Sequence, residues 1–154
     1  MICHCASFFS VTFLRGWRCC GSTKGVLLNH ETPFTVADMT SNLGDMLGEN
    51  PLFLGGDAGS DTMIMLHGMP LLEGARKLRA DGDDSLCVGG VRTAVDLVER
   101  GELRADKFKF FYKTVEWLPG QLAEQVADGL FGQVELSADL LLGQSGQKLS
   151  LIHI

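Results

Sequence analysis

The sequence predicts an α+β fold, a single domain with a mixed, mostly antiparallel, open-barrel-like sheet flanked by helices. The chain has 154 residues, of which 45% are hydrophobic and 21% charged, and this suits one globular domain with a sizeable core. Short runs rich in aromatic and β-branched residues alternate with segments of helical periodicity. They do so without the steady strand–helix–strand rhythm of a parallel sheet, which favours α+β over α/β.

Two paired strands are expected near the N-terminus. Residues 8–14 are rich in aromatic and β-branched side chains, and residues 25–29 form a second short apolar run after a polar turn. Next, Thr35 is placed to cap a helix that ends near Gly48. The apolar positions of this helix follow the 3.6-residue period: Val36, Met39, Leu43, Met46 and Leu47.

The middle of the chain predicts two strands joined by an acidic, glycine-rich turn. The first strand covers residues 52–54 and breaks at Gly55-Gly56, and the second covers residues 62–67. A strand-to-helix step follows. A strand at residues 86–88 runs into a second glycine pair, Gly89-Gly90, and then into a helix that ends near Gly101. One face of this helix is apolar: Val91, Ala94, Val95 and Val98.

The last third of the chain centres on an aromatic strand that runs into a proline-opened helix. Residues 108–114 predict the strand, and the fixed φ of Pro119 suits the first turn of a helix over residues 119–128, ended by Gly129. The apolar face of this helix recurs at four-residue spacing: Leu122, Val126 and Leu130. Two further elements are expected, a strand and a turn of helix: residues 131–136 and 137–142.

The composition excludes two classes of partner. The net charge is −6, from 13 basic and 19 acidic residues, and no basic cluster offsets it, so direct nucleic-acid binding is not expected. No apolar run approaches the roughly 20 residues that a membrane-spanning helix needs. We therefore expect a soluble protein.

The cysteines do not predict a metal site. Four lie in the first twenty residues, but their spacing does not give the ligand pairs that a tetrahedral zinc ion requires: Cys3, Cys5, Cys19 and Cys20. Cys87 lies inside an apolar strand, where burial raises a thiol pKa and lowers its reactivity. We therefore expect no metal and no cofactor.

Several of these motifs, in this order, resemble the YqgE/AlgH family over residues 8–143. The family occurs in bacteria and, in a plastid-associated form, in photosynthetic eukaryotes. The motifs that carry the resemblance are Gly25–Asn29, Leu54–Gly56, Leu66-His67, Val88–Gly90, Phe108–Phe111, Trp117, Pro119–Leu122 and Glu124. Residues 131–143 resemble the eukaryotic branch, which implies a location in the plastid or cytoplasm of a photosynthetic eukaryote. The chain departs from the family's pattern at Asp57-Ala58 and over residues 112–116.

Both ends of the sequence carry separate expectations. The family's leading strand has no visible counterpart before Phe8, so residues 1–7 are expected to be an incomplete N-terminus. The last six residues, 149–154, match the translation of a transposon-end adapter used in DNA library preparation. We expect them to be an artefact that truncates a domain spanning residues 8–148; the alternative is a short C-terminal strand.

One candidate site is a polar cleft. His67 ends an apolar strand, and Trp117, Gln121 and Glu124 cluster at the strand–helix junction, with positions 121 and 124 on one helical face. The two glycine pairs permit close backbone approach and often rim such clefts, which adds four candidate ligand-binding residues: Gly55, Gly56, Gly89 and Gly90. The alternative for each of these residues is a structural role.

Two functions from different classes fit these residues. The first is a binding or regulatory domain without catalysis, whose partner is a small molecule or a protein, because no complete catalytic constellation is present. The second is a small hydrolase-type enzyme that uses His67 and Glu124 as acid and base, with a metal held by aspartates. A histidine that is fully hydrogen-bonded at a strand end is the structural alternative for His67.

Overall fold

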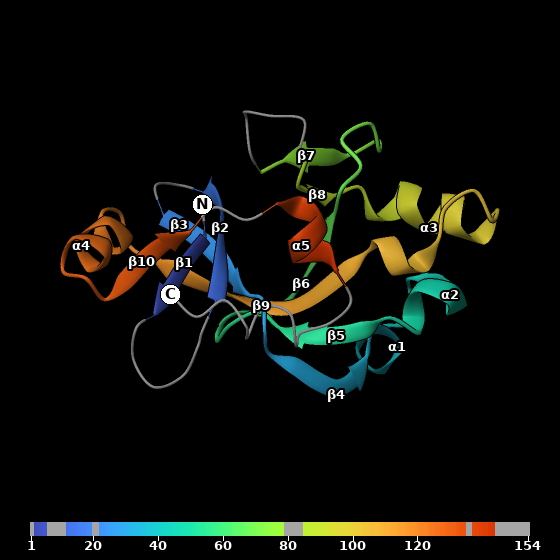
Figure 1. Ribbon diagram of the computed structural model, residues 1–154. Coiled ribbons are helices and arrows are strands. Elements are labelled where there is room, and N and C mark those ends of the chain that lie inside the picture. The colour runs from blue at the N-terminus through green and yellow to red at the C-terminus, as the bar shows by residue number, and fades with distance from the viewer. Residues whose placement is uncertain (1, 6–11, 20–21, 79–84, 135–136, 144–154) are drawn as a thin grey trace.

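The computed structural model confirms a mixed α+β fold built on a mostly antiparallel sheet (Figure 1). It describes residues 2–5, 12–19, 22–78, 85–134 and 137–143. The described strands run along the sheet in the order β10-β1-β2-β3-β9-β6-β8-β7, and β4 and β5 lie off this path, with β5 pairing with β9. The strands are β1 Ile2–Cys5, β2 Thr12–Cys19, β3 Ser22–Leu27, β4 Glu31–Thr35, β5 Pro51–Leu54, β6 Ala58–His67, β7 Ala75–Lys77, β8 Cys87–Gly89, β9 Lys109–Trp117 and β10 Phe131–Val134.

The helices are short and lie on both faces and at both ends of the sheet (Figure 1). They are α1 Val36–Met39, α2 Gly44–Gly48, α3 Val91–Glu99, the 3₁₀ turn η1 Ala105–Lys107, α4 Gln121–Ala127 and α5 Ala138–Leu142. Among the helices described, none has the length and hydropathy of a membrane-spanning segment.

Strand β9 is the central element of the sheet. Its N-terminal half pairs in parallel with β5, with Phe53 opposite Phe111, and its C-terminal end pairs antiparallel with β3, with Thr23 opposite Trp117. Its other edge pairs antiparallel with β6, with Leu66 opposite Lys109. Both edges of the aromatic strand are therefore occupied, which suits its dense apolar sequence.

The first glycine pair makes this arrangement possible. A Cβ atom on Gly55 would lie 2.4 Å from the carbonyl oxygen of Lys113, and one on Gly56 would lie 2.2 Å from the carbonyl carbon of Thr114. Gly55 also joins three strands, since its N–H donates to Tyr112 and its carbonyl accepts from Leu27. Only glycine allows the backbone to approach β9 this closely.

Alternation along the strands builds a core on each face of the sheet. On one face, Leu66 and Phe111 pack with Leu141 of α5. On the other face, Met65 and Phe110 pack with apolar residues of α1 to α3: Val36, Leu43, Leu47, Ala94 and Val98. Neighbouring residues of one strand point to opposite faces, so the paired aromatic residues of β9 serve both cores.

The predicted helix from Thr35 to Gly48 is wrong in one respect, because it is two short helices. Thr35 does cap the first, since the Asp38 carboxylate accepts from the Thr35 N–H and the two form a capping box. The helix stops at Thr40, whose backbone is extended, and the second begins at Gly44 with a positive φ of 67°. Polar residues between the two helices break the helical period there.

The junction after β9 also differs from the prediction. Pro119 lies in a turn, and α4 begins two residues later at Gln121, because Gly120 takes the left-handed conformation that turns the chain into the helix. Leu122 is buried as predicted, whereas Leu130 lies beyond the helix and is exposed. Gly129 follows the helix with a positive φ, as predicted for the stop.

Some pairings were not visible in the sequence. The predicted strands at residues 52–54 and 62–67 exist as β5 and β6, and they flank β9 on its two edges. Strand β1 was not predicted from the sequence, and it pairs with both β10 and β2. The predicted strands 8–14 and 131–136 extend into residues 8–11 and 135–136, which lie outside the described residues.

Replacing Gly56 with alanine should destabilise the protein by about 3 kcal/mol or more, because the new methyl group would overlap the backbone of Thr114. Urea denaturation followed by circular dichroism measures this. Gly68→Ala is the matched control, since a Cβ there meets its nearest atom at 3.5 Å, and it should change stability by less than about 0.5 kcal/mol. Equal stability of the Gly56→Ala variant and the wild-type protein would contradict the close approach.

Candidate functional site

His67 is a fully buried histidine whose two ring nitrogens are both engaged. Nδ1 accepts a hydrogen bond from the N–H of Met69 at 3.1 Å, and Nε2 lies 3.0 Å from the carbonyl oxygen of Gly89. A carbonyl only accepts, so Nε2 carries the proton and the ring is the neutral Nε2–H tautomer. The edge of the ring also faces Phe108, with centroids 5.8 Å apart. These contacts therefore favour the structural role for His67 over a role as a catalytic acid or base.

Burial lowers the pKa of His67 below its usual value of 6.5, although the bond to Gly89 opposes this shift. The imidazolium form is costly here because it would be desolvated and because Nδ1 already faces a donor. The described residues place no carboxylate beside the ring: Asp57 and Asp61 lie on the distant half of β6 and its approach, and both are exposed.

The junction of β9 and α4 holds the other three candidates. Trp117 is buried against Leu122, and its indole N–H donates to the side-chain oxygen of Gln125 at 3.1 Å. Gln121 folds back so that its side-chain oxygen accepts from the N–H of Leu118 at 2.9 Å. Glu124 is exposed in the first turn of α4. These contacts fix the turn before the helix.

The four candidates do not form one cleft. His67 lies beside the start of β9, where Leu66 pairs with Lys109, whereas Trp117 is the last residue of that strand. Eight residues of extended chain separate the two ends, which is about 26 Å at the rise of a β-strand. The predicted acid–base pair of His67 and Glu124 therefore does not form.

The two glycine pairs also serve different places. Gly55 and Gly56 lie under β9 in the middle of the sheet. Gly89 and Gly90 both have positive φ, and a Cβ on Gly90 would lie 2.8 Å from the Leu72 side chain, so this pair packs against the turn before β7. His67 contacts only the second pair, through Gly89. A binding role for any of these glycines stays a prediction.

A separate pocket opens beside His67, with a volume of about 460 Å³. It lies between the turn after β6, the 3₁₀ turn η1 and helix α5. None of the eight predicted ligand-binding residues lines it. The residues that do are Gly68, Met69, Leu103, Asp106, Lys107, Asp139, Leu142 and Gly143.

Each wall of this pocket is tied to the sheet by one buried polar side chain. His67 holds the first wall through the N–H of Met69. Asn50 holds the second, because its side-chain amide donates to the carbonyls of Ala105 at 2.8 Å and Phe108 at 2.9 Å, at the start of η1 and just after its end. Lys109 holds the third, through a long hydrogen bond of 3.5 Å from Nζ to the carbonyl of Leu141 in α5.

Lys109 is an unusual residue for a central strand, because its side chain is buried. The ammonium group lies 4.3 Å from the centroid of the Phe53 ring and 5.9 Å from that of Phe111. Burial lowers its pKa, and the negative charge of Glu31 partly opposes that shift. The two rings and the Leu141 carbonyl together offset part of the free energy that the ammonium group loses when it leaves water.

The lining of the pocket combines apolar and charged groups. Met69, Leu103 and Leu142 supply the apolar part, and Lys107 and Asp139 are exposed at its edge. Asp106 pairs with Arg104 through one carboxylate oxygen, and its other oxygen, Oδ1, is buried without a hydrogen-bond partner among the described atoms. Such an oxygen favours a ligand that donates a hydrogen bond.

The site offers no grouping for a metal ion among the residues that the structure describes, since no three His, Cys, Asp or Glu side chains converge there. Cys87 is a buried free thiol, and burial raises its pKa, as the sequence predicts, with Lys77 opposing the shift. The thiol form dominates at neutral pH, so a reactive cysteine is not present at this position.

Sequence reasoning missed the pocket because its walls come from three distant segments. Asp106-Lys107 precedes the aromatic strand and Asp139 opens the last helix, but nothing in their spacing indicates a shared site. A usable signal was the lysine inside the aromatic run Phe108–Phe111, since a charged residue in a buried strand requires partners.

The fold and the pocket together define a single-domain α+β protein with a preformed cavity at one end of a central strand. The AlgH-like family model matches residues 11–150, and the chain belongs to that family. No curated protein matches the chain.

Two solved structures show the same fold. The solution structure of the AlgH protein from Pseudomonas aeruginosa aligns with a TM-score of 0.70 at 13% identity, over 96% of this chain and 82% of that one. The crystal structure of a protein from Corynebacterium diphtheriae aligns with a TM-score of 0.69 at 16% identity, over 90% of this chain and 75% of that one. At these identities the likeness concerns the fold.

The buried neutral state of His67 should make stability depend on pH. Its pKa is lower in the folded than in the unfolded protein, so the stabilisation is complete above about pH 6.5 and is lost as pH falls toward the folded pKa. In that window the slope due to this residue is at most about 1.4 kcal/mol per pH unit. His67→Gln, which can make both hydrogen bonds but does not titrate, should have a shallower slope in urea denaturation between about pH 5 and 7.5. Identical slopes would show that His67 does not cause the dependence.

Trp117→Ala should destabilise the fold by about 3–5 kcal/mol, because the indole ring is buried in the cluster beneath α4. Guanidinium or urea denaturation gives the value. A loss below about 1 kcal/mol would instead indicate a ring that is free to face a ligand.

Proposed function

We propose that this protein is a non-catalytic binding or regulatory domain whose small-molecule ligand occupies the pocket between η1, α5 and the turn after β6. The observation that carries the proposal is that three buried polar side chains, His67, Asn50 and Lys109, each hold one wall in place. A buried polar side chain destabilises the fold unless it is hydrogen-bonded. The hydrogen bonds that these three side chains make to the three walls therefore support a preformed cavity. Its volume of about 460 Å³ lies within the usual range for ligand pockets.

The lining indicates the chemistry of the ligand. An apolar body would contact Met69, Leu103 and Leu142, while a hydrogen-bond donor would be attracted by the carboxylates of Asp106 and Asp139. An amphipathic molecule with an amine or amide group fits both requirements. The resemblance of residues 131–143 to the eukaryotic branch leads us to propose, further, that the protein acts in a plastid or cytoplasm of a photosynthetic eukaryote.

A pocket-filling variant tests the proposal. Gly68 lies on the pocket wall, its φ is not positive, and a Cβ there meets Leu142 only at 3.5 Å, so Gly68→Phe should fold and fill part of the cavity. A library of small amines and amides with apolar bodies is screened by ligand-observed NMR. We expect hits whose affinity falls about tenfold or more in Gly68→Phe, as for loss of a buried contact.

Ala123→Phe is the control, because Ala123 is exposed on α4 at the other end of the sheet and the variant adds the same ring. The library compounds that bind the wild-type protein should bind the Ala123→Phe variant with the same affinity. Two results would overturn the proposal: a library without hits, or hits that bind equally well to the Gly68→Phe variant.

A further inference from the structure

Exposed apolar side chains gather on one corner of the molecule. Among the described residues, six large apolar side chains are exposed, and three of them come from neighbouring elements: Phe34 of β4 at 55%, Met39 of α1 at 44% and Met46 of α2 at 54%. Helix α1 packs against both β4 and α2, so these elements form one region. Isolated exposed apolar residues are ordinary, whereas a group on adjoining elements indicates an interaction site.

The chain segment that forms this region carries acidic but no basic side chains. The sequence has no lysine or arginine between Lys24 and Arg76, but it has seven acidic residues there, all of them exposed: Glu31, Asp38, Asp45, Glu49, Asp57, Asp61 and Glu73. Three of these lie on or beside α1 and α2, among the exposed methionines. We call this region the acidic–apolar surface, and define it as Phe34, Asp38, Met39, Asp45, Met46 and Glu49.

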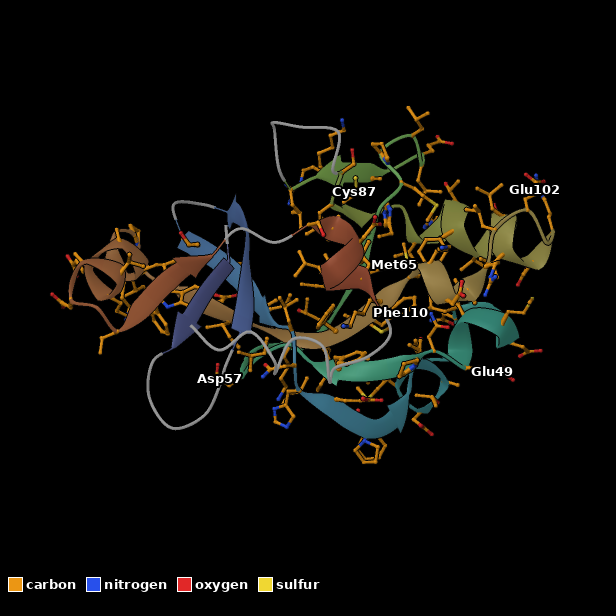
Figure 2. The ribbon with its side chains drawn as sticks, in the orientation of Figure 1. Glu49, Asp57, Met65, Cys87, Glu102 and Phe110 are labelled. Carbon is orange, nitrogen blue, oxygen red and sulfur yellow. The ribbon has the colours of Figure 1, made fainter. Side chains whose placement is uncertain are left out.

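The next helix, α3, borders this surface and carries charges of both signs, with Arg92 beside Asp96 and Glu99. Helix α2 contacts α3, and a Cβ on Gly44 would lie only 2.7 Å from the carboxylate of Glu99. Figure 2 shows Glu49 and Glu102 at this end of the molecule, with Asp57 farther along, toward the end that holds α4. A partner that docks here therefore meets negative charge around an apolar centre.

The edge of the sheet limits how a partner can dock. Strand β4 pairs only with β5 in the described sheet, which leaves it as an edge strand. Pro33 lies in the middle of β4 and lacks the N–H that a ladder needs, and proline on an edge strand opposes strand addition. A helix that lays an apolar face across Phe34 and the methionines does not need those backbone groups.

We infer that the acidic–apolar surface is a docking site for a basic amphipathic helix of a partner protein. Methionine adapts to varied apolar partners, and lysine or arginine beside the apolar stripe of such a helix would pair with Asp45 and Glu49. The site is separate from the ligand pocket and involves none of its lining residues. An anionic membrane surface would be repelled by the same carboxylates.

A designed helix serves as the probe. A fluorescent peptide of about 15 residues, with leucine at helical i, i+3 and i+4 spacing and lysine elsewhere, is titrated with the full chain and followed by anisotropy. We expect saturable binding that weakens as salt rises from about 50 to 300 mM. The same peptide with glutamate in place of lysine should not bind.

Matched variants locate the site. Asp45→Asn with Glu49→Gln should weaken binding about threefold or more, while Glu124→Gln with Asp128→Asn on α4 makes the same change in net charge and should leave it unaltered. Phe34→Ser with Met46→Ser should weaken binding about tenfold. Its control is Leu118→Ser with Leu130→Ser, which removes two exposed apolar side chains elsewhere.

Several outcomes would overturn this inference. They are the absence of peptide binding, an equal effect of the α4 charge variant, and an equal effect of the Leu118/Leu130 variant. Binding to phosphatidylserine vesicles in place of the peptide would likewise reject a protein partner. Circular dichroism of every variant confirms that the fold is retained.

Discussion

The close contact between Gly55-Gly56 and the backbone of β9 is the constraint on which the rest of the structure depends. It lets β3 and β5 follow one edge of β9 in succession, while β6 occupies the other edge. With both edges paired, the strand can carry Phe110 and Phe111 on opposite faces and serve as the core of both layers. The helices on each face then have an apolar surface to pack against, and without them the two faces would be exposed to water.

The pocket follows from the same strand. Lys109 is the first residue of β9 and pairs with Leu66 of β6, and His67 is the next residue of β6, so two of the three side chains that hold the walls come from neighbouring positions of the sheet. Asn50, just before β5, adds the third from the other edge of β9. Each bonds a backbone group of a segment with little regular structure of its own. The cost of burying the polar groups is offset by fixing segments that local propensity alone would leave undetermined.

Local sequence signals predicted the elements well where propensity and packing agree. Helix α3, with its buried Ala94 and Val98 and its following Gly101, matches the prediction closely. The aromatic strand β9 also lies where the sequence predicts it. Pro119 was misassigned because Gly120 turns the chain first. The proposed cleft failed for a different reason: His67 and Trp117 are both near the same strand, but at its two ends, and only the strand register reveals that separation. The sequence also contains no sign that Asp106 and Asp139, which are far apart in the chain, line the same pocket.

The anchoring of α5 couples the pocket to local opening of the fold. This helix has five residues, fewer than an isolated helix needs, so its order comes from Ala138 and Leu141 in the core and from the Lys109 contact. Its detachment would remove one wall of the cavity and expose part of the core in a single event. A ligand that touches Leu142 therefore binds only the closed form, and each occupied pocket lowers the population of the opened one. Ligand binding in the cavity would then slow hydrogen exchange of the backbone amides in α5.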